Sequence, residues 1–413
     1  MYNILDFGAV QNTMCTQSIQ SAIDECTSNG GGRVVIPAGV YISGTIYLKE
    51  NVELHLESGA ILKASTDIDD YNEDDAYEQN WGSQSEGWRA KHLIIALECD
   101  NVSITGYGVI DGSGDAFFGE ERRMPKWPGY AWDGGFVLAK DSQTLRPGQL
   151  ICFVEATNVR VENVTIQNTP CWSCFMYGCD YVQVRGVKIN NPIYYTNTDG
   201  LDIDCCRYVT ISDCIVSTGD DAIAIRCSGG KLKNPKPCEY ITITNCVLAS
   251  NSSLFRIGVG VGEIRNVRAS NLSVKKAASL INYTTSYCGR GEAIIEDVNF
   301  SNISAYDVGL GIDCQVAKGA VRNVTIENIR IKSQMGAVIK ATDEGEISDM
   351  TIRNVDMFID TKEKKINEKC AVNIENAENV LLDGLRIFSD SQMWEEMFCD
   401  TDCKNIIKRN CVL

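Results

Sequence analysis

The chain has 413 residues, of which 44% are hydrophobic and 23% are charged, a composition typical of a soluble globular protein with a large core. Its formal net charge of −17 opposes binding to nucleic acid and to anionic membranes, and it disfavours long polyanionic substrates unless a local basic site compensates. No apolar run approaches the roughly 18 residues that span a bilayer, and residues 1–8 lack the features of a signal peptide. We therefore expect a cytoplasmic protein.

The beginning of the chain is predicted to cap a larger structure. Residues 16–26 have the pattern of an amphipathic helix, with Thr16 as the N-cap and three glycines at 30–32 to end it. We assign residues 1–66 to this cap and to the first coils of a stacked fold, because the open end of such a stack needs a cover.

Two tryptophan-containing segments follow. Residues 67–92 include Trp81 and Trp88, and residues 112–148 include Trp127 and Trp132. Long insertions of this kind are usually functional, so we interpret both as walls of a sugar-binding cleft within a region of coils at 67–148. Plain surface loops are the alternative.

From about residue 100 onward the chain repeats an apolar alternating strand, an Asn or Asp, and a second short strand. Successive copies start at residues 208 and 240, and at 295, 321 and 347, which gives steps of 32, 26 and 26. This is the period of a solenoid. Asn and Asp suit the bends between strands because they tolerate left-handed backbone. We predict an all-β fold, a right-handed parallel β-helix forming one domain over 1–413, with central and catalytic coils at 149–358 and C-terminal coils at 359–413.

The 19 cysteines are an odd number, scattered along a long chain. We expect reduced, mostly buried thiols rather than a disulfide framework. Cys171 and Cys174 have the spacing of a metal or redox motif, but no second such pair follows at zinc-ribbon spacing. His55 and His92 are the two histidines, and both precede the acidic cluster described next, which disfavours Ser/His/Asp, Cys/His and histidine-ligated metal mechanisms.

The most informative cluster consists of acids on otherwise apolar repeats. Asp199 and Asp202 lie at one strand end, and Asp220 and Asp221 lie 21 residues after Asp199, close to one coil later. The register therefore predicts that Asp199 lies beside the tandem pair. Crowded carboxylates suit glycoside hydrolysis, because repulsion keeps one acid protonated to serve the leaving oxygen while another activates water. A ladder of turn-forming Asp residues is the structural alternative.

These residues carry a resemblance to a known family. The stretches 197–202 (NTDGLD) and 217–225 (STGDDAIAI) are similar to the two signature motifs of glycoside hydrolase family 28, the polygalacturonase family. Further stretches resemble its bacterial exo-acting branch, namely 6–9, 30–39, 54–61, 104–112, 146–147 and 168–172. The resemblance implies that Asp220 is the general acid and that Asp199 and Asp221 deprotonate the water. It also implies that the reaction inverts configuration and needs neither a metal nor another cofactor. Asp202, Asn197 and Trp172 are then candidate substrate-binding residues.

The chain departs from the family at two motifs. Ser252 falls where the family has a histidine, and Ile281 and Tyr283 fall at the positions of the Arg and Lys that hold the substrate's carboxylate. Arg256 could restore a cation, since a guanidinium can bind a carboxylate or a pair of hydroxyls; an outward surface arginine is the alternative. We count Ser252, Arg256 and Tyr283 among the candidate substrate contacts.

The sequence thus predicts an inverting, exo-acting glycosidase that acts on short neutral or singly charged oligosaccharides or glycosides, pectin-derived ones included. A calcium-dependent polysaccharide lyase and a non-catalytic carbohydrate-binding solenoid are the alternatives. We expect no nucleic-acid or membrane partner and leave a homo-oligomer open.

Overall fold

The computed structural model describes residues 1–73, 76–81, 91–119, 146–287, 289–360, 370–389, 394 and 396–412. The fold is a mostly-β parallel β-helix, as predicted. The described chain divides into two compact units. Unit 1 holds the described residues up to Asp220 together with Gly229–Lys236, and unit 2 holds Asp221–Ser228 and the residues from Pro237 onward. The assignment of all 413 residues to one domain stays a prediction.

Unit 1 is built from short strands. Its strands are β1 (Tyr2–Asn3), β2 (Gly32–Ile36), β3 (Gly39–Ser43), β4 (Ile46–Leu48), β5 (Val52–Leu56), β6 (Ala60–Ala64), β7 (Ile94–Leu97), β8 (Ser103–Gly106), β9 (Val109–Asp111), β10 (Ile151–Val154), β11 (Thr157–Glu162), β12 (Thr165–Gln167), β13 (Cys174–Tyr177), β14 (Asp180–Arg185), β15 (Lys188–Asn190), β16 (Leu201–Asp204), β17 (Arg207–Ser212) and β18 (Ile215–Thr218). Its 3-10 helices are η1 (Ile4–Phe7), η2 (Ile68–Asp70), η3 (Glu78–Trp81), η5 (Gly114–Ala116) and η7 (Gly229–Lys231).

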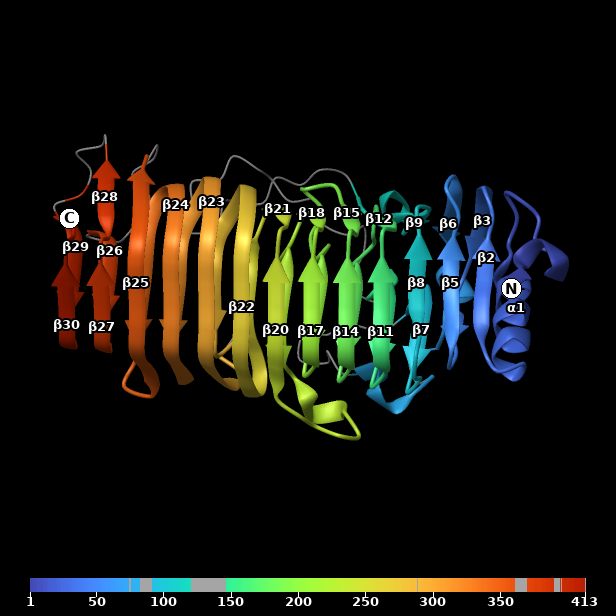
Figure 1. Ribbon diagram of the computed structural model, residues 1–413, viewed down its shortest axis with the longest axis horizontal. Coiled ribbons are helices and arrows are strands. Elements are labelled where there is room, and N and C mark those ends of the chain that lie inside the picture. Colours follow the sequence, from blue (N-terminus) through green and yellow to red (C-terminus); the bar gives the residue numbers. More distant parts are fainter. Residues whose placement is uncertain are drawn as a thin grey trace. The chain divides into compact units, whose positions relative to one another are not determined.

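These strands stack in three parallel rows, each strand pairing with the one a coil later. The rows run β2–β5–β8–β11–β14–β17, β3–β6–β9–β12–β15–β18 and β4–β7–β10–β13–β16. Figure 1 shows β5, β8, β11, β14 and β17 side by side. In the first row Val159, Val182 and Val209 are in register and buried, while their neighbours along each strand face outward. The period-two alternation in the sequence therefore builds one continuous core.

Unit 2 contains much longer strands. Its elements are β19 (Ile223–Cys227), β20 (Cys238–Thr244), β21 (Val247–Ser250), β22 (Ser253–Thr284), β23 (Glu292–Val316), β24 (Gly319–Ala341), β25 (Gly345–Ile359), β26 (Cys370–Glu375), β27 (Glu378–Asp383), β28 (Arg386–Ser389), β29 (Glu396–Thr401) and β30 (Lys404–Arg409). β22 pairs in turn with β19, β20 and β21, so it follows an entire coil without interruption. β22, β23, β24 and β25 then stack in parallel (Figure 1).

Asparagine fills the recurring bends of unit 2. Asn271, Asn302, Asn328 and Asn354 all have positive φ angles, between 49° and 57°. Their side chains also connect neighbouring coils: Asn302 Nδ2 donates to Asn271 Oδ1 at 3.3 Å, and Asn354 Nδ2 donates to Asn328 Oδ1 at 3.2 Å. The prediction that Asn and Asp supply left-handed backbone at the bends is confirmed.

The predicted N-terminal helix is present as α1 (Thr16–Ser28), and it buries Ile19, Ala22, Ile23 and Cys26. The prediction that Thr16 is the N-cap is wrong. Cys15 occupies that position without a side-chain capping bond, and Thr16 Oγ1 instead accepts the Gly44 N–H at 2.8 Å. The hydroxyl is therefore used to fasten the helix to the turn after β3. None of the helices in the described ranges is long and apolar enough to cross a membrane.

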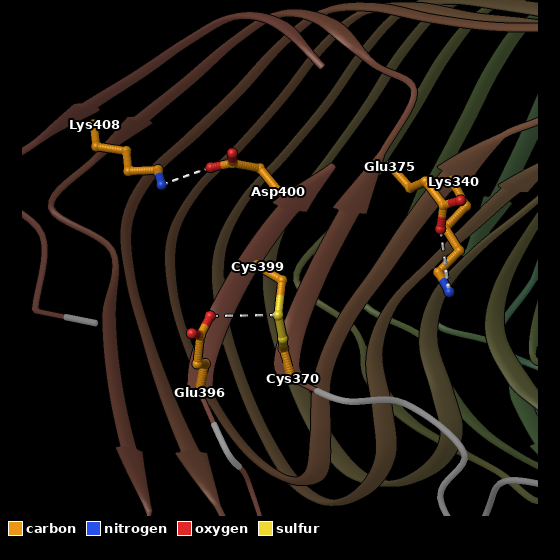
Figure 2. The surroundings of a disulfide bond; sticks show 7 residues. All are labelled: Lys340, Cys370, Glu375, Glu396, Cys399, Asp400 and Lys408. Atoms are coloured by element: carbon orange, nitrogen blue, oxygen red, sulfur yellow. Dashed lines mark hydrogen bonds and ion pairs between the residues drawn. A yellow bond between two sulfur atoms is a disulfide. The ribbon is translucent and has the colours of Figure 1, made fainter. Parts of the chain in front are cut away.

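The cysteines are mostly buried, as predicted, but not all of them are thiols. Cys370 in β26 and Cys399 in β29 form a disulfide with a Cα–Cα distance of 5.9 Å. Figure 2 shows this bond between neighbouring strands, with the ion pairs Lys340–Glu375 and Lys408–Asp400 nearby. The expectation of reduced cysteines is therefore wrong at these two positions.

Candidate active site

Two of the predicted catalytic carboxylates lie together in unit 1. Asp199 precedes β16 and Asp220 follows β18, so each sits where the chain enters or leaves a strand. A carboxylate oxygen of Asp199 lies within 4.8 Å of one of Asp220. Asp199 is 4% exposed. Two carboxylates this close repel when both are ionised, which favours a proton on one of them.

The chain around Asp220 is held by local hydrogen bonds. Thr218 Oγ1 donates to the Asp220 carbonyl at 2.6 Å, and the Gly219 N–H donates to Thr198 Oγ1 at 3.1 Å. A Cβ atom at Gly219 would come within 2.0 Å of the Tyr195 carbonyl oxygen, so this position needs glycine. The glycine thus lets the turn 195–198 lie directly against the acid-bearing turn.

Asn197 contacts Asp220 through its backbone. Its N–H donates to Asp220 Oδ2 at 3.0 Å, and its φ angle of 60° is left-handed. Its side-chain Oδ1 accepts from Arg146 Nη2 at 2.9 Å. Asn197 was predicted as a substrate contact, whereas these bonds hold the general-acid candidate. Arg146 was noticed in the sequence only as part of a similar motif, because nothing in its local sequence shows a contact 51 residues away.

Asp202 and Trp172 are both enclosed. Asp202 is fully buried in β16, in register with Phe175 of β13. Trp172 is 2% exposed and packs edge-on against Phe175, with ring centroids 5.4 Å apart, in a cluster that also contains Cys152 and Tyr177. Trp172 therefore presents no open ring face, and the structure gives it a packing role where we predicted a substrate contact.

The third carboxylate, Asp221, belongs to unit 2 and is 3% exposed. Its Oδ1 accepts the Ser253 N–H at 3.0 Å and Arg256 Nη2 at 3.1 Å, and its Oδ2 accepts from Arg256 Nε. The Arg256 side chain is 16% exposed. Arg256 is therefore not an outward surface arginine, because its guanidinium binds Asp221 with two donors.

Arg256 also leads into a row of polar side chains. Its Nη1 donates to Thr284 Oγ1 at 3.1 Å and to Asn282 Oδ1 at 3.4 Å, and its guanidinium lies 6.0 Å from the Tyr287 ring centroid. Asn282 Nδ2 in turn donates to Asp313 Oδ2 at 2.8 Å. We call Arg256, Asn282, Thr284 and Asp313 the polar row. Its residues project from one face of β22 and β23.

Tyr283, a predicted substrate contact, does not join Arg256 in the polar row. Side chains alternate along β22, so Asn282 and Thr284 join Arg256 while Ile281 and Tyr283 turn into the core, at 0% and 2% exposure. Burial raises the pKa of Tyr283 well above its usual range, so its hydroxyl stays neutral. The structure thus separates Tyr283 from the contacts of Arg256.

Ser252, at the position of the family's histidine, lies in the turn before β22. Its N–H donates to Ser250 Oγ at 2.8 Å, and its carbonyl accepts the Ala278 N–H at 2.9 Å. These bonds are made by its backbone and fix the turn.

The predicted cleft walls fall largely outside the described residues, which exclude Trp88, Trp127, Trp132 and the side chain of Trp81. Carboxylate oxygens are also the ligands that Ca²⁺ prefers, so the expectation of a metal-free reaction stays a prediction.

Known proteins resemble this chain over most of its length. The model of "Glycosyl hydrolases family 28" matches residues 26–395. A probable polygalacturonase of Vitis vinifera is 29% identical over 233 residues, covering 54% of this chain and 44% of the relative. An exo-poly-alpha-D-galacturonosidase of Dickeya chrysanthemi is 28% identical over 268 residues, covering 55% and 42%. The matches thus span about half the length of either curated relative.

Solved structures agree. A hyperthermoactive exopolygalacturonase from Thermotoga maritima has a TM-score of 0.71 at 26% identity, covering 92% of this chain and 91% of that one. A family 28 exopolygalacturonase of Yersinia enterocolitica has a TM-score of 0.71 at 19% identity, covering 98% and 78%, a likeness of fold alone.

Proposed function

Because the chain belongs to glycosyl hydrolases family 28, we propose that the protein hydrolyses glycosidic bonds with Asp199, Asp220 and Asp221 as its acid/base groups. The observation that carries the proposal is the placement of Asp199 and Asp220 within 4.8 Å of each other, at the two motifs that resemble the family. Such pairing of carboxyl groups is the chemical requirement for glycoside hydrolysis.

In the proposed reaction one carboxyl group donates a proton and another accepts one. Asp220 gives its proton to the oxygen of the leaving group as the glycosidic bond breaks. Asp199 and Asp221 take a proton from the water that attacks the anomeric carbon, so the enzyme ends each cycle with the same number of protons. The family resemblance implies inversion. Inverting enzymes usually separate their two carboxyl groups by about 6.5–9.5 Å, which is more than the distance between the Asp199 and Asp220 oxygens. Identifying the anomer that is released first therefore tests whether the reaction inverts configuration.

We also propose that the substrate is a short neutral or singly charged oligosaccharide attacked from its end. The similarity of the chain to exo-acting polygalacturonases supports attack at the end of the substrate. The polar row argues against a uronate as the preferred sugar: the charge of Arg256 is already offset by Asp221, and the row ends in a further carboxylate, Asp313. A substrate carboxylate placed there would meet hydroxyl and amide groups and a like charge.

A screen tests this function. Aryl glycosides and pectin-derived oligosaccharides, digalacturonate included, are incubated with the protein, and products are identified by chromatography and by NMR of the first anomer. We expect saturated monosaccharides released one at a time, with higher kcat/KM on a neutral substrate than on digalacturonate. Digalacturonate cleaved at least as well as every neutral substrate would contradict the specificity, and an unsaturated product absorbing in the ultraviolet would contradict hydrolysis.

Asp220→Asn is the control for the chemistry. General acid catalysis contributes about 10²–10⁴-fold, so kcat on a substrate with a poor leaving group should fall by that factor with an unchanged circular dichroism spectrum. Retention of more than about a tenth of the kcat would rule out Asp220 as the acid.

A further inference from the structure

Arg146 is a buried arginine beside the turn that carries Asn197. It is 5% exposed, its Nη2 donates to Asn197 Oδ1 at 2.9 Å, and its Nη1 donates to the Pro170 carbonyl at 2.8 Å and to the Thr196 carbonyl at 3.4 Å. Two of its contacts are therefore to consecutive residues of one turn.

An aromatic stack supports the guanidinium from the side. Arg146 lies 5.5 Å from the centroid of Phe118, whose ring stacks on Tyr195 at 3.9 Å. The Tyr195 hydroxyl donates to Asp115 Oδ1 at 2.6 Å, and its carbonyl accepts from Thr198 Oγ1 at 2.9 Å. The turn 195–198 is thus fixed at both ends, and Arg146 binds Asn197 within it. A planar fork of donors suits this task better than an ammonium group does.

The held residue presents its amide to the acid. The Asn197 N–H donates to Asp220 Oδ2 at 3.0 Å. A protonated carboxyl has one hydroxyl oxygen and one carbonyl oxygen, and the carbonyl oxygen is the better acceptor of an N–H group. This hydrogen bond therefore favours Oδ2 as the carbonyl oxygen and Oδ1 as the oxygen that carries the proton when Asp220 is protonated.

We propose that Arg146 is a positioning residue for proton donation, acting through the Asn197 amide to fix which oxygen of Asp220 carries the proton. This rests on the proposed function, in which Asp220 is the general acid. When the Oδ1–H bond breaks, the proton goes to the glycosidic oxygen and the electron pair stays on Asp220. The Asn197 N–H then faces a carboxylate, and a hydrogen bond to a charged acceptor is stronger than one to a neutral acceptor. The amide stabilises charge that develops during the reaction.

The test is a series of aryl glycosides of the same sugar that differ only in the acidity of the leaving phenol. An activated phenol leaves without a proton, so misplacing the acid slows only the poor leaving groups. For Arg146→Gln we expect kcat on the poorest leaving group to fall about 10–100-fold, with less than about a threefold change on the most activated one. Arg207→Gln is the matched control, because Arg207 likewise donates from two of its nitrogens in unit 1, in its case to the carboxylate of Asp180. It should leave the leaving-group dependence unchanged.

Asn197→Gly provides a second variant if Arg146→Gln does not fold. Glycine accepts the left-handed backbone of Asn197 but removes the oxygen that Arg146 holds. We expect the same selective loss. Equal losses on all leaving groups, or no loss on any, would overturn the role of Arg146. Asp220→Asn runs in parallel: if Asp220→Asn lacks the selective loss, the acid assignment itself fails, whereas a selective loss in Asp220→Asn alone rejects only the positioning role.

Discussion

Arg256 is a residue whose role follows from its partners. The Nε and Nη2 atoms of its guanidinium both donate to the carboxylate of Asp221, a residue that is 3% exposed. Removing one member of a buried ion pair leaves an uncompensated charge and costs about 3–5 kcal/mol. We therefore expect Arg256→Ala to lower the free energy of unfolding by about that amount and to lower kcat by at least about 100-fold by releasing Asp221.

Urea denaturation and steady-state kinetics measure the two effects. Arg322→Ala is the control, because Arg322 pairs with Glu346 at an exposed site, with side-chain exposures of 40% and 48%, where ion pairs contribute about 0–1 kcal/mol. Silent behaviour of Arg256→Ala in both assays would show that Asp221 does not depend on it.

His92 makes the stability of unit 1 depend on pH. Burial lowers its pKa to about 4, although a hydrogen bond to the Gln149 carbonyl opposes the shift. The unfolded chain, with a histidine pKa near 6.5, binds more protons than the folded chain between about pH 4 and 6.5. The free energy of unfolding should therefore fall by roughly 2–3 kcal/mol as the pH drops from 7 to 4.5.

Urea titrations at a series of pH values isolate this contribution when wild type is compared with His92→Gln. The variant should lose that part of the pH dependence, while His55→Gln, at a partly exposed histidine, should keep it. Identical pH profiles for wild type and His92→Gln would contradict the assignment.

At the residue scale, the sequence predicted the acids and missed their partners. Asp199, Asp220 and Asp221 stand out because three carboxylates on apolar repeats are unusual. Arg146 does not, because its importance comes from a fold that brings it to Asn197. The burial of Tyr283 was not predicted, because a shift of one residue moves a strand side chain to the opposite face, and local sequence does not fix which residues face the core.

Among the elements, the disulfide between β26 and β29 is the feature with the clearest energetic effect. It closes a loop across a sequence separation of 29 residues. In the chain-entropy model a loop of this length stabilises the fold by roughly 3–4 kcal/mol. Cys370→Ser with Cys399→Ser should therefore speed hydrogen exchange in β26, β29 and β30, with little change in β22.

Cys403→Ser is the control, since this thiol lies in the same coil and donates to the Thr401 carbonyl. Alkylation of the unfolded, unreduced protein should label no more than 17 of the 19 cysteines. Labelling of all 19 would show that the bond is absent.

The repeating strands were predictable as elements because each repeat copies the same burial pattern. The bends were predictable too, because left-handed backbone restricts the residues that fit. The continuity of β22 over 32 residues was not, since it depends on the pairing of one strand with three different neighbours.

At the scale of the whole molecule, the net charge of −17 governs encounters with charged polymers. Like charges repel over about 10 Å at 0.1 M salt, and added salt screens them. Binding of polygalacturonate should therefore tighten as ionic strength rises from about 10 to 300 mM. Affinity electrophoresis measures this, with a neutral galactan as the control that should not respond. Weakening with salt would instead reveal a local basic site.

The register of β23, β24 and β25 has a further consequence for engineering. Val298, Val324 and Met350 are register partners in consecutive coils, separated by the same 26 residues each time. Excising or duplicating one such 26-residue segment would rejoin surfaces that already match, with the apolar positions and the asparagine bends still aligned. The number of coils in this part of unit 2 can therefore change in whole steps, and deletion or duplication of residues 324–349 would do so while Arg256, Asn282 and Asp313 stay in place.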